Sequence, residues 1–127
     1  MIEQRKSTRY QSFAKANIEG AGAGEILLKD ISVTGCRVEC TTYMEVKLNQ
    51  QYKLEIVPEK AANLGPFELH VESKWIRIGN YFYEIGFVIT KSPKRKQFQR
   101  YVDYLSWRYD QGISMTGNEL SKEPPQI

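Results

Sequence analysis

The sequence predicts a mainly β domain, in which six short antiparallel strands close into a barrel and a C-terminal α-helix follows. Two patterns and the composition support this. Between residues 13 and 89, short segments alternate apolar and polar residues with the period of two that half-buried strands require. After residue 92, apolar residues recur at helical spacing. The 127 residues are 41% hydrophobic and 26% charged, which is ordinary for one soluble globular domain.

The predicted strands cover residues 13–18, 25–33, 36–40, 52–57, 67–78 and 81–89. Cys36 and Cys40 share one strand face and are expected to be reduced core residues, because a strand holds them too far apart for a disulfide. The alternation slips near Ser73–Ile76, which predicts a bulge. Gly79-Asn80 predicts a short hairpin turn. Closure into a barrel is favoured because it removes exposed strand edges.

The segments outside the strands complete the expected organisation. Ser92 is expected to cap the helix, with Pro93 at its first position. One helix face is predicted to carry Phe98, Tyr101, Val102, Leu105 and Tyr109. Residues 1–12 are expected to form an N-terminal arm, residues 13–109 the barrel and helix, and residues 110–127 a disordered tail.

The net charge of +3 is distributed unevenly. Residues 1–15 carry +3 and residues 91–108 carry +5, so the positive charge is concentrated in the arm and in the helix segment. This mild excess is far from that of a nonspecific DNA binder. The N-terminus lacks the apolar run of a signal peptide, and no apolar stretch is long enough to span a bilayer. We therefore expect a cytoplasmic protein.

The residues that catalysis would need do not occur in a catalytic pattern. His70 is the only histidine, and one histidine with two thiols cannot supply an ordinary zinc site. The glycine-rich segment Gly20–Gly24 is not followed by the Lys-Ser or Lys-Thr of a phosphate-binding loop, so we interpret it as a flexible connection. The sequence predicts a protein that is not an enzyme and that holds no metal or cofactor.

Two short motifs stand out together. Arg5 and Arg9 form an RxxxR in the arm, a spacing that alone is common on solvated segments. Asp30, Ser32 and Gly35 form a DxSxxG between two predicted strands. There the carboxylate and the hydroxyl share a strand face, and the glycine would permit a turn with positive φ.

In this order, flanking the first strand of a small barrel, the two motifs closely resemble those of the PilZ domain. The resemblance covers about residues 4–108 and extends to Gly86-Phe87 and to Trp75. It implies a six-stranded barrel with a C-terminal helix that binds the bacterial second messenger cyclic di-GMP. The ligand-binding residues it implies are Arg5, Arg9, Asp30, Ser32, Gly35 and Trp75, with Lys6 and Arg37 as secondary contacts. In the family, a basic residue just before RxxxR favours binding of a ligand dimer. Here that position is Gln4, so the resemblance favours one ligand molecule per site.

The chemistry of these residues suits the ligand. An arginine fork can bond two phosphate oxygens, or O6 and N7 of a guanine. The Asp30 carboxylate can accept guanine N–H donors, and the Trp75 indole can stack on a base. The same residues also have structural interpretations: the arginines can simply be solvated, Asp30 and Ser32 can satisfy turn amides, and Trp75 can pack on the barrel.

The sequence therefore predicts a cyclic di-GMP sensor or adaptor. Its arm would change conformation on binding and signal to a separate effector protein, in motility, polysaccharide or secretion pathways. Two alternatives stay open at this point. One is a small barrel that binds single-stranded nucleic acid, and the other is a PilZ-like interaction adaptor without a ligand. The basic start of the helix, its exposed face and the tail from Gly112 are candidate partner surfaces.

Overall fold

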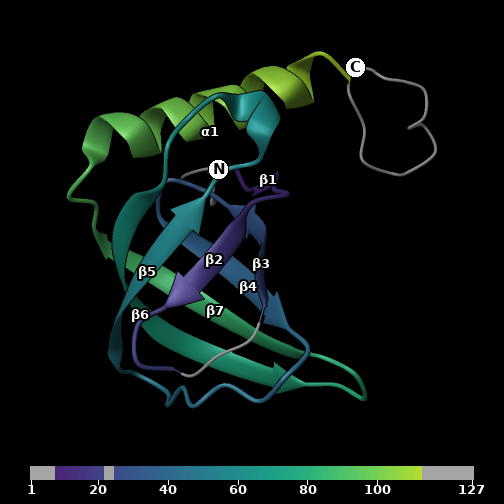
Figure 1. The fold of residues 1–127 in the computed structure, drawn as a ribbon, viewed down its shortest axis with the longest axis vertical. Helices are drawn as coiled ribbons and strands as arrows, with labels where there is room; N and C mark the ends of the chain where they lie inside the picture. Colours follow the sequence, from purple (N-terminus) through teal and green to yellow (C-terminus); the bar gives the residue numbers. More distant parts are fainter. Residues whose placement is uncertain (1–7, 22–24, 113–127) are drawn as a thin grey trace, which may run out of the picture.

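The computed structural model describes residues 8–21 and 25–112, and confirms a six-stranded antiparallel barrel with one C-terminal helix (Figure 1). The elements are β1 (Tyr10–Gln11), β2 (Lys15–Ile18), β3 (Ile26–Ile31), β4 (Gly35–Cys40), β5 (Gln51–Val57), a 3-10 turn η1 (Lys60–Ala62), β6 (Phe67–Ile78), β7 (Tyr83–Lys91) and α1 (Arg95–Asp110).

Strand β3 closes the barrel. The seven strands form one sheet in the order β1-β3-β2-β5-β6-β7-β4, and an additional pairing of β3 with β4 closes β2 to β7 into the six-stranded barrel. On its other edge β3 pairs with β2 through Leu27 and Ile26, and then with the two-residue β1 through Ile31 and Asp30. The short β1 therefore pairs with the C-terminal end of β3, whereas β2 pairs with the beginning of β3. This pairing brings the segment around β1 onto the barrel.

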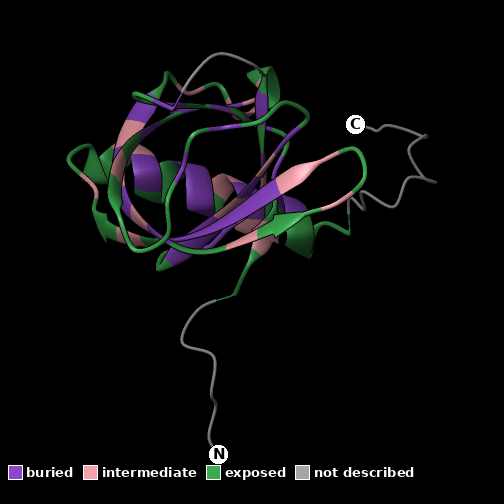
Figure 2. Ribbon diagram, turned by 90° about the horizontal axis from the view of Figure 1, so that it is seen from below, coloured by how far each residue is buried: buried purple, intermediate pink, exposed green. Residues whose placement is uncertain are grey.

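Helix α1 lies across one end of the barrel (Figure 1). Its buried side chains Phe98, Tyr101, Val102 and Leu105 join the core formed by the inward residues of the strands. In Figure 2, buried residues occur on the helix and alternate with less buried ones along the strands. Cys36 and Cys40 are buried and free, which confirms their prediction as core residues.

The structure confirms the predicted bulge and corrects the predicted turn. The register between β6 and β7 shifts between Ser73 and Trp75, with a second shift between His70 and Val71. The connection between these strands is longer than the expected Gly79-Asn80 turn, because β7 begins only at Tyr83. It spans residues 79–82 and is closed by the Gly79 N–H, which donates to the Phe82 carbonyl at 2.9 Å.

Both ends of the predicted helix pattern also need correction. Ser92 does not cap α1, because β7 runs on to Lys91 and the first helical bond joins the Phe98 N–H to the Lys94 carbonyl. At the other end Tyr109 is 68% exposed, and Arg108 takes the buried position. Residues 113–127, which include most of the predicted tail, lie outside the described residues, as do residues 1–7 and 22–24.

A cluster of buried and partly buried polar groups links the segment around β1 to α1. The Tyr101 hydroxyl donates to Glu59 at 2.6 Å and lies 2.6 Å from the Ser12 hydroxyl. The Arg108 guanidinium donates to the other Glu59 oxygen at 2.8 Å and to the carbonyl of Gln11. We call Gln11, Ser12, Glu59, Tyr101 and Arg108 the arm–helix cluster. Burial and the Glu59 charge raise the pKa of Tyr101, so its hydroxyl stays a proton donor.

We expect Arg108→Met to lower the free energy of unfolding by about 3 kcal/mol, because it leaves the largely buried Glu59 carboxylate without its cationic partner. Urea denaturation followed by circular dichroism measures the change. The matched control is Arg95→Met, an exposed arginine of the same helix, which should stay within about 0.5 kcal/mol of the wild type. Equal stability of the two variants would contradict this role of Arg108.

We expect both thiols to resist iodoacetamide at pH 8 in the folded protein and to react in urea, as measured by mass spectrometry. Burial raises the pKa of Cys36 to about 12 and that of Cys40 to about 11, from the ordinary value of 9.0, and the thiolate is the reactive form. Just above pH 9 the two thiols ionise in the unfolded state and stay protonated in the folded state. The free energy of unfolding therefore decreases as the pH rises through that range. Equal labelling rates in the two states would contradict the prediction.

Candidate functional site

The predicted ligand residues within the described chain gather on one side of the barrel. Asp30 on β3 is paired with Arg37 on β4, and Arg37 is paired with Gly86 on β7. Gly86 is paired in turn with Trp75 on β6. Strand pairing therefore places these four residues in one row across four neighbouring strands. Arg5 and Lys6 lie outside the described residues, so their roles stay predictions.

The Asp30 carboxylate is shared by two arginines. Arg9 donates to one of its oxygens at 2.9 Å, and the Arg37 Nε donates to the other at 2.9 Å. Arg37 also donates to Glu84 at 2.7 Å, and Glu84 accepts from the Nε of Arg77 at 3.0 Å. We call this alternating series Arg9, Asp30, Arg37, Glu84 and Arg77 the charge ladder. It runs from the residue before β1 to β6 and leaves one excess positive charge.

Sequence reasoning missed the second half of the charge ladder. Glu84 is 4% exposed although it belongs to a charged residue type, and the two arginines account for its burial. Arg77 and Glu84 are directly opposite each other on β6 and β7. The sequence does show a glutamate between Tyr83 and Ile85 in the predicted strand 81–89. Its arginine partners, however, can be identified only from the pairing of β7 with β4 and β6.

The Ser32 hydroxyl works within the turn between β3 and β4. It lies 3.1 Å from the backbone nitrogens of both Thr34 and Gly35, which donate to it. The Ser32 N–H donates to the Gly35 carbonyl at 2.8 Å, and the residue is 1% exposed. This serine therefore holds the turn that joins β3, which carries Asp30, to β4, which begins at Gly35. Its direct contact with a ligand stays a prediction.

Gly35 is required by close packing, and the expectation of a positive φ was wrong. Among the described residues, the glycines with positive φ are Gly20 and Gly112. A Cβ on Gly35 would lie 2.8 Å from the Phe87 carbonyl oxygen and 3.3 Å from a guanidinium nitrogen of Arg9. The missing side chain thus lets β4 approach β7 closely and leaves room for the Arg9 guanidinium.

The indole of Trp75 lies against the backbone of Gly86. A Cβ on Gly86 would lie 2.2 Å from both Cε2 and Nε1 of the indole. Trp75 is nevertheless 43% exposed. The residue therefore packs on the barrel, as one interpretation of the sequence held, and it also presents aromatic surface to solvent.

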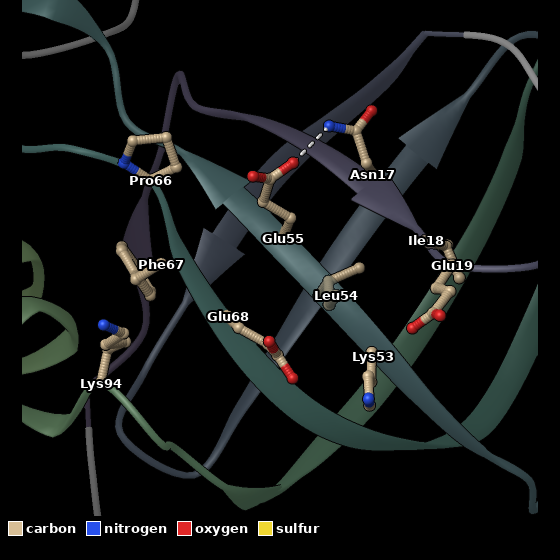
Figure 3. Close-up of a pocket in the computed structure, with 10 residues that line it drawn as sticks. All are labelled: Asn17, Ile18, Glu19, Lys53, Leu54, Glu55, Pro66, Phe67, Glu68 and Lys94. Atoms are coloured by element: carbon tan, nitrogen blue, oxygen red, sulfur yellow. Dashed lines mark hydrogen bonds between the residues drawn. The ribbon is translucent and has the colours of Figure 1, made fainter.

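A groove of about 400 Å³ lies elsewhere, over β2, β5 and β6 near the start of α1 (Figure 3). Its lining residues are Asn17, Ile18, Glu19, Lys53, Leu54, Glu55, Pro66, Phe67, Glu68 and Lys94. None of the predicted ligand residues that the structure describes lines it. Its three carboxylates against two ammonium groups disfavour an anionic ligand, so we do not assign the nucleotide to it.

Other kinds of site find no support in the described part of the chain. It contains no group of three or more histidine, cysteine or acidic side chains that could hold a metal ion. His70 pairs with the carboxylate of Glu68 at 2.7 Å. No helix among the described residues has the length and apolar character to cross a membrane.

Comparison with known proteins shows the fold. No protein-family model and no curated protein matches the sequence. The chain is similar to the structure of the Bacillus subtilis inhibitor of motility MotI/DgrA, with 16% identity and a TM-score of 0.70 over 87% of this chain and 53% of that one. It thus spans about half of that protein. It is also similar to the PilZ domain of YcgR from Escherichia coli with c-di-GMP, with 15% identity, a TM-score of 0.65, and coverage of 87% and 98%. The chain therefore has the PilZ fold.

We expect Gly35→Ala to lower the free energy of unfolding by about 1–3 kcal/mol, because the added methyl group meets the Phe87 carbonyl. Urea denaturation gives the value. Gly65→Ala is the matched control, since a Cβ there meets no atom within 4 Å, and it should leave the protein as stable or slightly more stable. A Gly35→Ala variant as stable as this control would contradict the packing argument.

Proposed function

We propose that this protein binds cyclic di-GMP on the outer surface of β3, β4, β6 and β7 and acts as an adaptor without catalysis. The observation that carries the proposal is the contact between the two motifs. In this chain, which has the PilZ fold, Arg9 is the last arginine of RxxxR and Asp30 is the aspartate of DxSxxG. The two side chains form an ion pair with an N–O distance of 2.9 Å. In support, the similar PilZ domain of YcgR is described with c-di-GMP.

Binding would exchange one partner for another at Asp30. The Arg9 side chain is 45% exposed, and a pair this open to water contributes only about 0–1 kcal/mol. Arg9 can therefore leave Asp30 for a phosphate or a guanine edge, where its fork makes two charge-assisted bonds. The released Asp30 oxygen can then accept guanine N–H donors.

The rest of the charge ladder keeps Asp30 in place during that exchange. Arg37 bonds the second Asp30 oxygen and is itself held by Glu84. Glu84 is in turn fixed by Arg77 from the next strand. Because these contacts do not involve the arm, the carboxylate keeps its orientation when Arg9 departs. Preorganisation of this kind lowers the entropic cost of binding.

Trp75 would bind a base by stacking. Its indole is supported by Gly86 and is partly exposed in the same row as Asp30. Stacking of a base on an aromatic side chain contributes about 1–3 kcal/mol in single-strand binders. Arg5 and Lys6 are proposed to add contacts from the arm, and Gln4 favours one ligand molecule per site.

The arm–helix cluster would limit the conformational change to the first residues of the chain. It fixes Gln11 and Ser12 on α1, only two residues after Arg9. A ligand that attracts Arg5 and Arg9 would then reorder the segment before Tyr10 and leave the barrel unchanged. The altered arm would report the presence of the ligand to a separate effector protein, and we propose motility, polysaccharide or secretion machinery as its class.

We expect Arg9→Ala and Asp30→Asn each to weaken cyclic di-GMP binding at least tenfold in isothermal titration calorimetry, because a hydrogen bond to a charged group contributes about 1.5–3 kcal/mol. The matched control is Arg95→Ala, an exposed arginine on α1, which should bind as the wild type does.

Two results would overturn the proposal: no heat with the wild type, or wild-type affinity in both variants. A single-stranded oligonucleotide serves as the competing ligand. If the oligonucleotide bound more tightly than the dinucleotide and its affinity fell steeply with salt, the nucleic-acid alternative would be preferred.

A further inference from the structure

The side of α1 that faces away from the barrel carries a continuous line of exposed residues. They recur at helical spacing opposite the buried face, and they are Lys96, Arg100, Asp103, Trp107 and Asp110. The helix lies across the end of the barrel with this side turned outward (Figure 1). We call these five residues the outer line of α1. At 1.5 Å per residue, it runs for about 20 Å.

The first half of this surface is strongly basic. Lys91, Lys94 and Arg95 precede Lys96 and Arg100, and all five side chains are exposed. Among the described residues, none of the five forms an ion pair; the pairs that the structure does contain involve other cations. The first turn of α1 also lacks an acidic residue, although the helix dipole favours anions there. Stability of the helix therefore does not account for these cations.

The second half of the outer line presents an aromatic anchor. Trp107 is 52% exposed and lies on the outer line, with its ring 6.1 Å from that of Tyr104. Tryptophan and arginine are the residues that most often dominate the energy of protein interfaces. A basic stretch that leads to an exposed tryptophan is thus the composition of a protein-binding surface.

We propose that the outer line of α1 binds an acidic segment of a partner protein. The carboxylates of the partner segment would pair with Lys96 and Arg100, and an apolar side chain of that segment would pack on Trp107. A membrane of anionic lipid or a nucleic acid fits less well, because its negative charge is continuous and would also face Asp103 and Asp110. The acidic residues of a peptide need to meet only Lys96 and Arg100. The proposal rests on the proposed adaptor function only in that an adaptor needs a partner.

The position of α1 gives such a partner access to the arm. Arg108 of α1 bonds the carbonyl of Gln11, and the Tyr10 hydroxyl lies 3.4 Å from that of Ser106. The Tyr10 ring also meets the ring of Tyr109 edge-on at 5.8 Å. A protein bound on α1 therefore lies beside the segment in which the nucleotide would act.

The test uses defined probes and no nucleotide, so that its failure is distinct from failure of the proposed function. A fluorescein-labelled peptide with a run of glutamates followed by two leucines is titrated with the protein, and its anisotropy is measured. We expect binding by the wild type, at least tenfold weaker binding by K96E/R100E, and several-fold weaker binding by Trp107→Ala. A peptide with lysines in place of the glutamates should bind K96E/R100E in preference to the wild type.

Lys47→Glu is the matched control, because the segment that contains Lys47 runs along the end of the barrel opposite α1 (Figure 1). It should bind the glutamate peptide as the wild type does. Vesicles of phosphatidylglycerol and an oligothymidylate are titrated in parallel. The proposal is overturned if the peptide does not bind, if K96E/R100E binds it as tightly as the control, or if vesicles or oligothymidylate bind more tightly than the peptide.

Discussion

The pairing of β3 with β4 is the constraint on which the rest of the structure depends. It closes the sheet, so each of the six strands β2 to β7 has a neighbour on both sides. It also places Asp30 opposite Arg37, between the register shift after Leu28 and the turn held by Ser32. A barrel opened at this seam would lose its core and its candidate site together, because the same strands supply both.

Positive and negative side chains alternate across the candidate surface. Each carboxylate of the charge ladder lies between two arginines, so the cations are held apart by the groups that neutralise them. Glu84 can be almost fully buried under this arrangement, since a buried charge needs partners that satisfy it. Among the described residues, Arg95, Lys96 and Arg100 at the start of α1 form no ion pair. The cations of the charge ladder and those at the start of α1 therefore lie in different electrostatic settings.

The sequence predicted well what local patterns decide and poorly what distant contacts decide. Alternation located the barrel strands and the bulge near Trp75, because burial of one strand face leaves that signal. Helical spacing alone could not distinguish Tyr109 from Arg108, since the partner that buries Arg108 is Glu59, far away in sequence. The role of Gly35 was misjudged for the same reason: its neighbour across the sheet, and not its own turn, excludes a side chain. The motifs brought Arg9 and Asp30 into consideration, whereas the arginine and glutamate that complete the charge ladder follow only from strand register.

The Arg9–Asp30 ion pair has a consequence for selectivity if the proposed exchange takes place. An incoming phosphate must compete with the Asp30 carboxylate for the Arg9 guanidinium, so attraction by charge alone gains little. A mononucleotide would displace the same contact while offering a single purine and a single phosphate in return. A ligand with two purines and two phosphates can offer new partners to both Arg9 and Asp30 when their ion pair breaks. Under the proposed exchange, the Asp30 carboxylate would act as an internal competitor and would disfavour small nucleotides without a steric barrier.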